Sequence, residues 1–282
     1  MKKTIAFFVL LTMGCISANA QDIDLENALR ATYTNCVGID DALHDMKVKA
    51  GINTAVTGVG TVAGGAALAV GIKKAHLMDK LSSIEDKYLD QYPQQSFDDI
   101  NIIQDTGFKP NLKSKRKKLG NWRTGLLAVN AATNIAGATI AGTNKVNKSL
   151  EEQIDDCKLS VKDLKNAITR AKFNGEDVIE ANEIANACGD FAYVDISKIN
   201  NRAKGAEISS IVGGTTGVVG VITSAVANKS SGEKERKLDT ASNVLAGGAT
   251  IFTGTATVFN ATQIAAIKKV ANVAEKCTGV LK

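Results

Sequence analysis

Four long stretches of the chain contain no Asp, Glu, Lys or Arg, and this pattern strongly limits the folds open to it. The stretches cover residues 50–72, 124–144, 208–228 and 240–267. A helix of about 21 residues is about 30 Å long, which matches the hydrocarbon core of a lipid bilayer. Ser, Thr, Asn and Gly dilute the apolar residues in all four stretches. The pattern predicts four helices that are each long enough to cross a membrane.

The composition favours helices over strands and loops. The 282 residues include only 2 Pro but 25 Gly. Scarce Pro favours long uninterrupted helices, because Pro breaks a helix interior. Interior Gly costs about 1 kcal/mol relative to Ala in a soluble helix, whereas in membrane helices it lets two backbones approach closely. The sequence therefore predicts an all-α fold of Gly/Ala-rich apolar helices.

The N-terminal residues have the features of a secretory signal peptide. Lys2 and Lys3 precede an apolar run at 5–13, and small residues at 18 and 20 form a cleavage site before Gln21. This pattern predicts a signal peptide over 1–20. Cys15 offers lipidation as an alternative, although Thr12 stands where a lipobox has Leu. We expect export to the cell membrane, with the periplasm or secretion as the alternative.

The chain repeats one pattern in its two halves. Each half runs from a Cys through a charge-free stretch, a polar turn and a second charge-free stretch to another Cys. A duplicated antiparallel helical hairpin explains this pattern economically. The sequence predicts a first hairpin at 21–172, a linker at 173–187 and a second hairpin at 188–282. An insertion at 81–118, where we expect the helices to stop, lengthens the first tip.

Four cysteines remain after the signal peptide, and three pairings of them are conceivable. In an exported protein an even number of cysteines indicates disulfides. The two helices of an antiparallel hairpin bring its flanking cysteines together. We therefore predict the bonds Cys36–Cys157 and Cys188–Cys277.

The same hairpin register predicts which residues face one another. It places Gly58 opposite Ile135 and Gly213 opposite Phe252, so that a large side chain meets a glycine, as close packing requires. An a/d-like apolar series over 25–46 predicts a helix through that whole segment.

Four spans and an exported N-terminus fix a topology. All four cysteines then lie outside the cytoplasm, and both hairpin tips lie inside. The first tip carries a basic run that we call the basic tip: Lys113, Lys115, Arg116, Lys117 and Lys118. Cytoplasmic basic residues satisfy the positive-inside rule and can contact anionic lipid headgroups. We expect no nucleic acid partner, because interleaved aromatic residues and a recognised binding fold are missing.

Each half also contains a GxxxG pattern. Gly60 and Gly64 form it in the first half, and Gly213 and Gly217 form it in the second. Such small-residue faces let helices pack closely. We favour packing within each hairpin, and an oligomer interface or a glycine-lined pore is the alternative.

The sequence shows no motif for catalysis, a metal or a cofactor. The glycines over 58–65 do not form a phosphate loop, because no strand precedes them and no Lys-Ser/Thr follows. Asp40, Asp41, His44 and Asp45 have helical spacing, and we expect a solvated helix face there rather than a metal site. We therefore expect neither an enzyme nor a small-molecule substrate.

These patterns predict a structural or interaction role in a membrane, with the lipid bilayer as partner and an oligomer or pore as a further option. The alternative is a soluble periplasmic or secreted coiled-coil protein, stapled by disulfides, that binds a partner. The asparagines within the charge-free stretches and the a/d-like series favour this alternative. A third option is a secreted protein that inserts its hairpins into foreign membranes.

Overall fold

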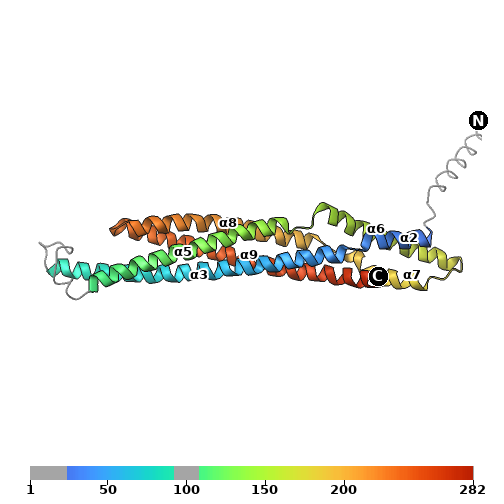
Figure 1. Ribbon diagram of the computed structural model, residues 1–282, viewed down its shortest axis with the longest axis horizontal. Helices are drawn as coiled ribbons and strands as arrows, with labels where there is room; N and C mark the ends of the chain where they lie inside the picture. Colours follow the sequence, from blue (N-terminus) through green and yellow to red (C-terminus); the bar gives the residue numbers. More distant parts are fainter. Residues whose placement is uncertain (1–23, 92–107, 282) are drawn as a thin grey trace, which may run out of the picture. The chain divides into compact units, whose positions relative to one another are not determined.

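The computed structural model describes residues 24–91 and 108–281, and all regular structure in these ranges is helical. This confirms the prediction of an all-α fold for the described residues. The helices are α2 (Leu25–Cys36), α3 (Ile39–Gln91), α5 (Phe108–Thr143), α6 (Lys148–Phe173), α7 (Ile179–Ala187), the short 3₁₀ helix η2 (Gly189–Tyr193), α8 (Ser197–Lys229) and α9 (Gly232–Leu281) (Figure 1). The predicted signal peptide at 1–20 lies outside the described residues, as does the middle of the 81–118 insertion.

The chain forms two compact units. One, here called the disulfide unit, comprises the described residues of 1–43, 147–195 and 269–282. The other, here called the bundle unit, comprises the described residues of 44–146 and 196–268. Each unit contains residues of both predicted hairpins. The boundaries between the units therefore differ from the predicted boundaries between the hairpins. The predicted linker at 173–187 also contains a helix, α7.

A helix break separates α2 from α3, so the prediction of one helix over 25–46 is wrong. α2 ends at Cys36, and Val37 is extended with φ −70° and ψ 136°. Gly38 follows with φ +90°, a backbone conformation that residues with a Cβ rarely adopt. α3 then begins at Ile39. The a/d-like series continues across a turn that a single glycine makes possible.

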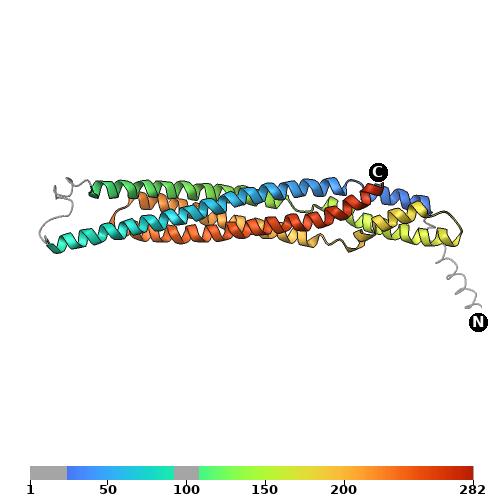
Figure 2. The ribbon, with the colours of Figure 1, turned by 90° about the horizontal axis from the view of Figure 1, so that it is seen from below.

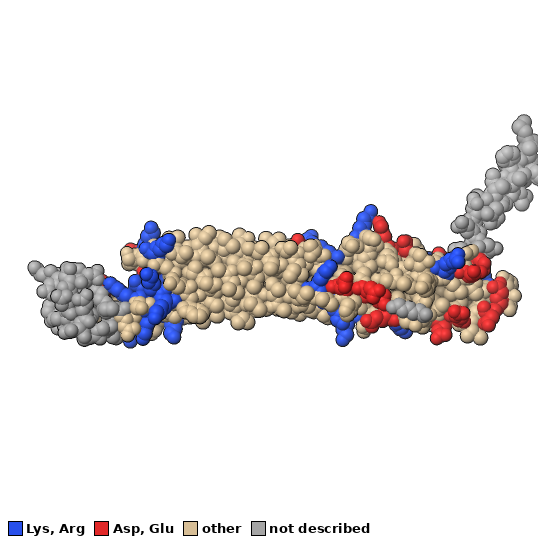
Figure 3. Space-filling model, viewed as in Figure 1, with Lys and Arg blue, Asp and Glu red and all other residues tan. Residues whose placement is uncertain are grey.

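The bundle unit consists of α3, α5, α8 and α9, which lie side by side in two perpendicular views (Figures 1 and 2). These helices contain the four charge-free stretches. On the face drawn in Figure 3, the middle of the bundle unit carries no charged side chain, and Lys and Arg gather beyond it. The described chain has four helices that are long and apolar enough to cross a membrane.

α3 ends and α5 begins within the predicted insertion at 81–118, and both helices extend beyond its borders. α3 continues to Gln91, because 81–91 contains neither Gly nor Pro. α5 begins at Phe108, and Pro110 lies in its first turn, where a missing N–H costs no intrahelical hydrogen bond. The basic tip therefore lies on a regular helix.

Neighbouring helices pair in nearly the predicted register. Some of the residues predicted to face one another nevertheless lie on faces that do not meet. A Cβ built on Gly213 would lie 3.3 Å from the Phe252 Cβ, as predicted. Gly58 does not face Ile135, since no atom lies within 4 Å of a Cβ built on Gly58. Gly60 instead lies against Thr133. The prediction assumed an apolar interior, whereas polar side chains face many of these glycines.

Candidate functional site

Along its charge-free stretches the bundle unit buries many polar side chains among small apolar ones, mostly alanines, and exposes large apolar side chains. Its buried polar side chains, none more than 8% exposed, are Asn53, Thr57, Asn130, Asn134, Asn144, Ser209, Ser210, Ser224, Ser242, Thr253, Asn260 and Gln263. Large apolar side chains point outward instead, such as Val62 at 74%, Val244 at 71% and Ile251 at 68% exposure. Soluble helices bury their apolar stripe and expose the polar one. In the bundle unit, by contrast, polar side chains share the interior with alanines and Leu127, and many large apolar side chains lie outside.

Hydrogen bonds between side chains join the helices of the interior. The Asn53 Nδ2 of α3 donates to the Asn260 Oδ1 of α9 at 2.9 Å. Asn130 Nδ2 of α5 donates to the Gly60 carbonyl of α3 at 2.7 Å and to Thr253 Oγ1 of α9 at 3.1 Å. Asn134 Nδ2 donates to the same Thr253 hydroxyl at 2.7 Å. These bonds give the amide nitrogens of Asn53, Asn130 and Asn134 partners away from water, whereas the side-chain oxygens of Asn53 and Asn134 accept no hydrogen bond within the described residues.

The four glycines singled out in the sequence are all buried inside the bundle unit. Gly60 and Gly64 lie against side chains of α5 and α9, and Gly213 lies against Asn134 and Phe252. Gly217 lies against Ala131, whose Cα is 3.2 Å from a Cβ built on the glycine. The contacts of these glycines are thus made within one chain.

We expect Gly217→Val to destabilise the bundle unit by about 1–3 kcal/mol, because the added side chain would push α8 away from the α5 backbone. Thermal unfolding of the purified protein in detergent, followed by circular dichroism, measures the loss. Gly247→Val is the matched control, since no atom lies within 4 Å of a Cβ built on Gly247. Equal losses in the two variants would contradict close packing of α8 on α5.

Five charged side chains form a buried cluster, here called the charged layer: Lys74, Arg116, Arg123, Glu235 and Asp239. Lys74 and Arg123 are 1% and 0% exposed. The Lys74 Nζ lies 2.8 Å from one carboxylate oxygen of Asp239 and 3.2 Å from Glu235 Oε1. Arg123 pairs with the other Asp239 oxygen, and Arg116 Nη2 lies 3.4 Å from Glu235 Oε2. Each buried cation therefore faces a carboxylate.

Neutral side chains complete the hydrogen bonding of the charged layer. Arg123 Nε donates to Ser224 Oγ at 3.0 Å, and Arg123 Nη1 donates to Asn243 Oδ1 at 3.1 Å. Lys74 Nζ donates to Asn228 Oδ1 at 3.1 Å. Buried ion pairs offset their desolvation only when such further hydrogen bonds are made.

The charged layer closes one end of the charge-free part on α3, α5 and α9, and its neutral partner Asn228 lies at the same end of α8. Arg123 and Asp239 directly precede stretches 124–144 and 240–267, Asn228 ends 208–228, and Lys74 follows 50–72 by two residues. The sequence analysis missed these residues as a group. Their position could have identified them, because each lies at the same end of a charge-free stretch once the hairpins are folded.

The basic tip has mixed surroundings. Arg116 joins the charged layer, whereas Lys115, Lys117 and Lys118 are exposed on α5. Lys113 is also exposed. Only one of its five residues thus belongs to the buried cluster.

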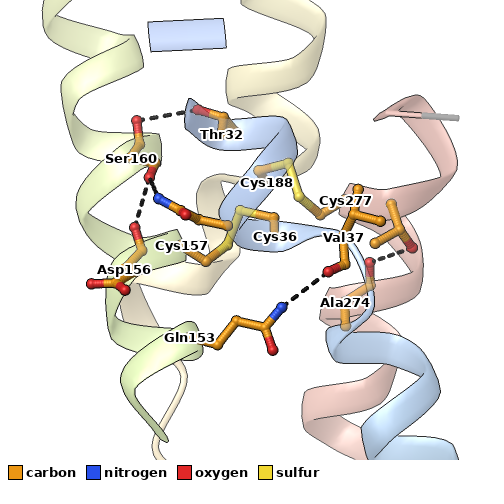
Figure 4. The surroundings of a disulfide bond; sticks show 12 residues. Thr32, Cys36, Val37, Gln153, Asp156, Cys157, Ser160, Cys188, Ala274 and Cys277 are labelled. Carbon is orange, nitrogen blue, oxygen red and sulfur yellow. Dashed lines mark hydrogen bonds between the residues drawn. A yellow bond between two sulfur atoms is a disulfide. The ribbon is translucent and has the colours of Figure 1, made fainter. Parts of the chain in front are cut away.

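The disulfide unit contains both cysteine pairs that the sequence predicts, Cys36–Cys157 and Cys188–Cys277 (Figure 4). All four cysteines are buried. Next to the first bond, Thr32 Oγ1 of α2 donates to the Ser160 carbonyl of α6 at 3.3 Å. Gln153 Nε2 of α6 donates to the Val37 carbonyl at 3.0 Å and so satisfies the backbone at the helix break.

No group of three or more His, Cys, Asp or Glu side chains that could hold a metal occurs within 24–91 and 108–281. Among the acidic cluster of the sequence, Asp41, His44 and Asp45 are exposed. Asp40 Oδ2 accepts a hydrogen bond from Thr278 Oγ1 at 3.1 Å.

Comparison with known proteins gives no lead: no protein-family model, no curated protein and no solved structure matches the chain. The role of the bundle unit therefore has to be argued from its own chemistry.

Proposed function

We propose that the chain is an exported, non-enzymatic membrane protein whose bundle unit spans a lipid bilayer, with a structural or interaction role. The observation that carries the proposal is the apolar outer surface of the bundle unit together with the polar side chains in its interior. Asn and Thr side chains bond to one another inside it, whereas Val and Ile side chains point outward along its charge-free stretches. In lipid, polar groups need partners within the protein, and apolar groups need none.

The proposed topology places the four cysteines outside the cytoplasm and the basic tip inside. An oxidising compartment suits the two disulfides. The cytoplasmic side suits the basic tip and the second turn at 229–237. The proposed repeat of two hairpins, each with a cytoplasmic tip and an outer disulfide, agrees with this topology.

We expect the full chain to stay in the membrane pellet after a carbonate wash and to require detergent for extraction. Val62→Lys supplies the sharper measurement, because Val62 is central in 50–72 and 74% exposed. A lysine facing lipid at mid-depth lowers insertion by about 2.5–3.5 kcal/mol, whereas on a surface in water it costs within about 0.5 kcal/mol. We therefore expect a marked loss of membrane-inserted Val62→Lys protein.

Val48→Lys is the control, because Val48 is 48% exposed but precedes the charge-free stretch. It should insert like the unaltered protein. Recovery of the unaltered chain in the soluble fraction without detergent would refute the membrane proposal.

The disulfide unit favours a second candidate, a soluble coiled-coil protein that binds a partner. Its helices have ordinary polarity: Ile154, Val161 and Leu164 of α6 are buried, and charged residues surround them at the surface. The unit also exposes Phe173 at 94% and Tyr193 at 87%. A monodisperse helical species in sedimentation without detergent would favour this candidate.

A further inference from the structure

A shallow apolar groove lies on the outer surface of the bundle unit between α3 and α5. One hollow of about 450 Å³ is lined by α3, including Gly58, Val62 and Ala66, and by Leu126 of α5. A second of about 460 Å³ also includes Leu126 and extends along α5 to Trp122. The shared residue makes the two hollows parts of one groove.

Missing side chains create this groove. No atom lies within 4 Å of a Cβ built on Gly58, Gly65 or Gly125. These three glycines therefore do not serve helix packing within the chain, unlike Gly60 and Gly64, which lie against other helices. Their exposed backbone leaves room for a ligand on the lipid-facing side.

Lysines lie at one end of the groove. On α5, Lys115, Lys118 and Trp122 follow one another at spacings of three and four residues, and Gly125 and Val129 continue the same face. Lys115 and Lys118 are exposed, and neither makes an ion pair within the described residues.

α3 contributes a lysine at a similar height. Lys73 is exposed and follows Val62 and Ala66 by 11 and 7 residues, which places it on their face of α3. A Cβ built on Gly71 would lie 3.2 Å from Arg123 Cδ, so α3 and α5 are neighbours at this level. Lys73 and Lys118 therefore lie close to the same position along the helix axes. The groove is thus flanked by a lysine on each of its two helices.

On α5 the groove covers about one leaflet, whereas on α3 it continues to Gly58, 15 residues or about 22 Å from Lys73. Lys118 and Val129 are 11 residues apart on α5, which is about 17 Å along a helix. Half of the hydrocarbon core of a bilayer is about 15 Å. A lipid whose headgroup lies at Lys118 would therefore extend its acyl chain along the groove to the middle of the bilayer.

We propose that this groove binds an anionic phospholipid of the cytoplasmic leaflet. Lys73 and Lys118 contact the phosphate, Trp122 lies at the interface, and one acyl chain lies along Gly125 and Leu126. The lysines at the end of the groove favour an anionic phospholipid over a second copy of the chain. The charge-free stretches of a second copy would place no negative charge next to these lysines. The inference rests on the proposed membrane function and on a cytoplasmic basic tip, where anionic lipids are found.

Native mass spectrometry of the full chain in mild detergent, titrated with phosphatidylglycerol or phosphatidylcholine, tests the site. We expect one phosphatidylglycerol per chain and much weaker retention of phosphatidylcholine. Each lysine near a lipid phosphate contributes about fivefold in affinity, so Lys118→Gln should bind phosphatidylglycerol about fivefold more weakly and Lys73→Gln with Lys118→Gln about 30-fold. Lys117→Gln removes the same charge from another face of α5 and should change little.

Gly125→Leu should also abolish retention, because the leucine would fill the groove, whereas Gly247→Leu on α9 should not. Equal binding of the two lipids, or equal effects of Lys117→Gln and Lys118→Gln, would overturn the site. Disruption of a dimer by Gly125→Leu without loss of lipid would assign the groove to a second copy instead. An unaltered chain that needs detergent but lacks lipid preference overturns only this inference, whereas one that needs no detergent overturns the membrane proposal.

Discussion

Replacing Asp239 with Asn is expected to destabilise the bundle unit by about 3–5 kcal/mol, the usual cost of leaving a buried ion pair with one partner. Asp239 lies within ion-pair distance of both Lys74 and Arg123, which are almost wholly buried. The substitution would leave Arg123 opposite a neutral amide and Lys74 with Glu235 as its one remaining carboxylate partner among the described residues. Thermal unfolding in detergent, or the yield of folded protein where the variant fails to assemble, measures this loss.

Glu233→Gln is the matched control for this substitution. Glu233 lies on the same helix, six residues before Asp239, and the two side chains of its ion pair with Lys237 are 78% and 76% exposed. Exposed pairs of this kind contribute about 0–1 kcal/mol. A loss for Asp239→Asn as small as that for Glu233→Gln would mean that the charged layer does not hold the helices together.

A double-mutant cycle separates the ion pair from general damage. Lys74→Met should be strongly destabilising alone, because Asp239 and Glu235 then lose a shared cation. Combined with Asp239→Asn, it should cost less than the sum of the two single losses, since the pair is removed as a unit. Strict additivity would contradict direct coupling of the two side chains.

Removing the Cys36–Cys157 bond is expected to destabilise the disulfide unit by about 5 kcal/mol, because the bond closes a loop of 121 residues. The α2 helix has only 12 residues, too few to be stable by itself in water. In a variant with Cys36→Ser and Cys157→Ser, hydrogen exchange should therefore show loss of amide protection in α2 and α6.

Amides in the middle of α3 supply the internal control, because they belong to the bundle unit. Their protection should change much less than that of α2. Reductant should have the same effect on α2 in the unaltered chain and little further effect on α2 in the serine variant. Undiminished protection of α2 in that variant would show that packing on α6 suffices without the bond.

The sequence predicts those parts of the fold that depend on order along the chain. Missing charges indicate the four long helices, and the antiparallel hairpin indicates the cysteine pairs. Two details of the helix boundaries could not be predicted, for local reasons. Gly38 adopts a positive φ that the periodicity over 25–46 does not reveal, and Pro110 lies where a helix tolerates it.

The candidate site was harder to predict, because it depends on which helices from different halves become neighbours. Lys74 and Asp239 are 165 residues apart, and only the pairing of α3 with α9 brings them together. The sequence also does not show which face of each helix packs against its neighbours. Gly58 and Gly60 are alike in the sequence, yet one opens to the groove and the other packs against Thr133. Charges at the ends of the stretches identify the members of the layer but not their partners.

The distribution of charge in the charged layer has a consequence for synthesis. All three of its cations, Lys74, Arg116 and Arg123, belong to α3 and α5, and both of its carboxylates belong to α9. A ribosome makes the cations more than a hundred residues before the acids that neutralise them. In the proposed topology, the first half of the nascent chain therefore carries three unpaired positive charges at the cytoplasmic edge of the membrane. The two carboxylates that pair with them are added only when α9 has been made.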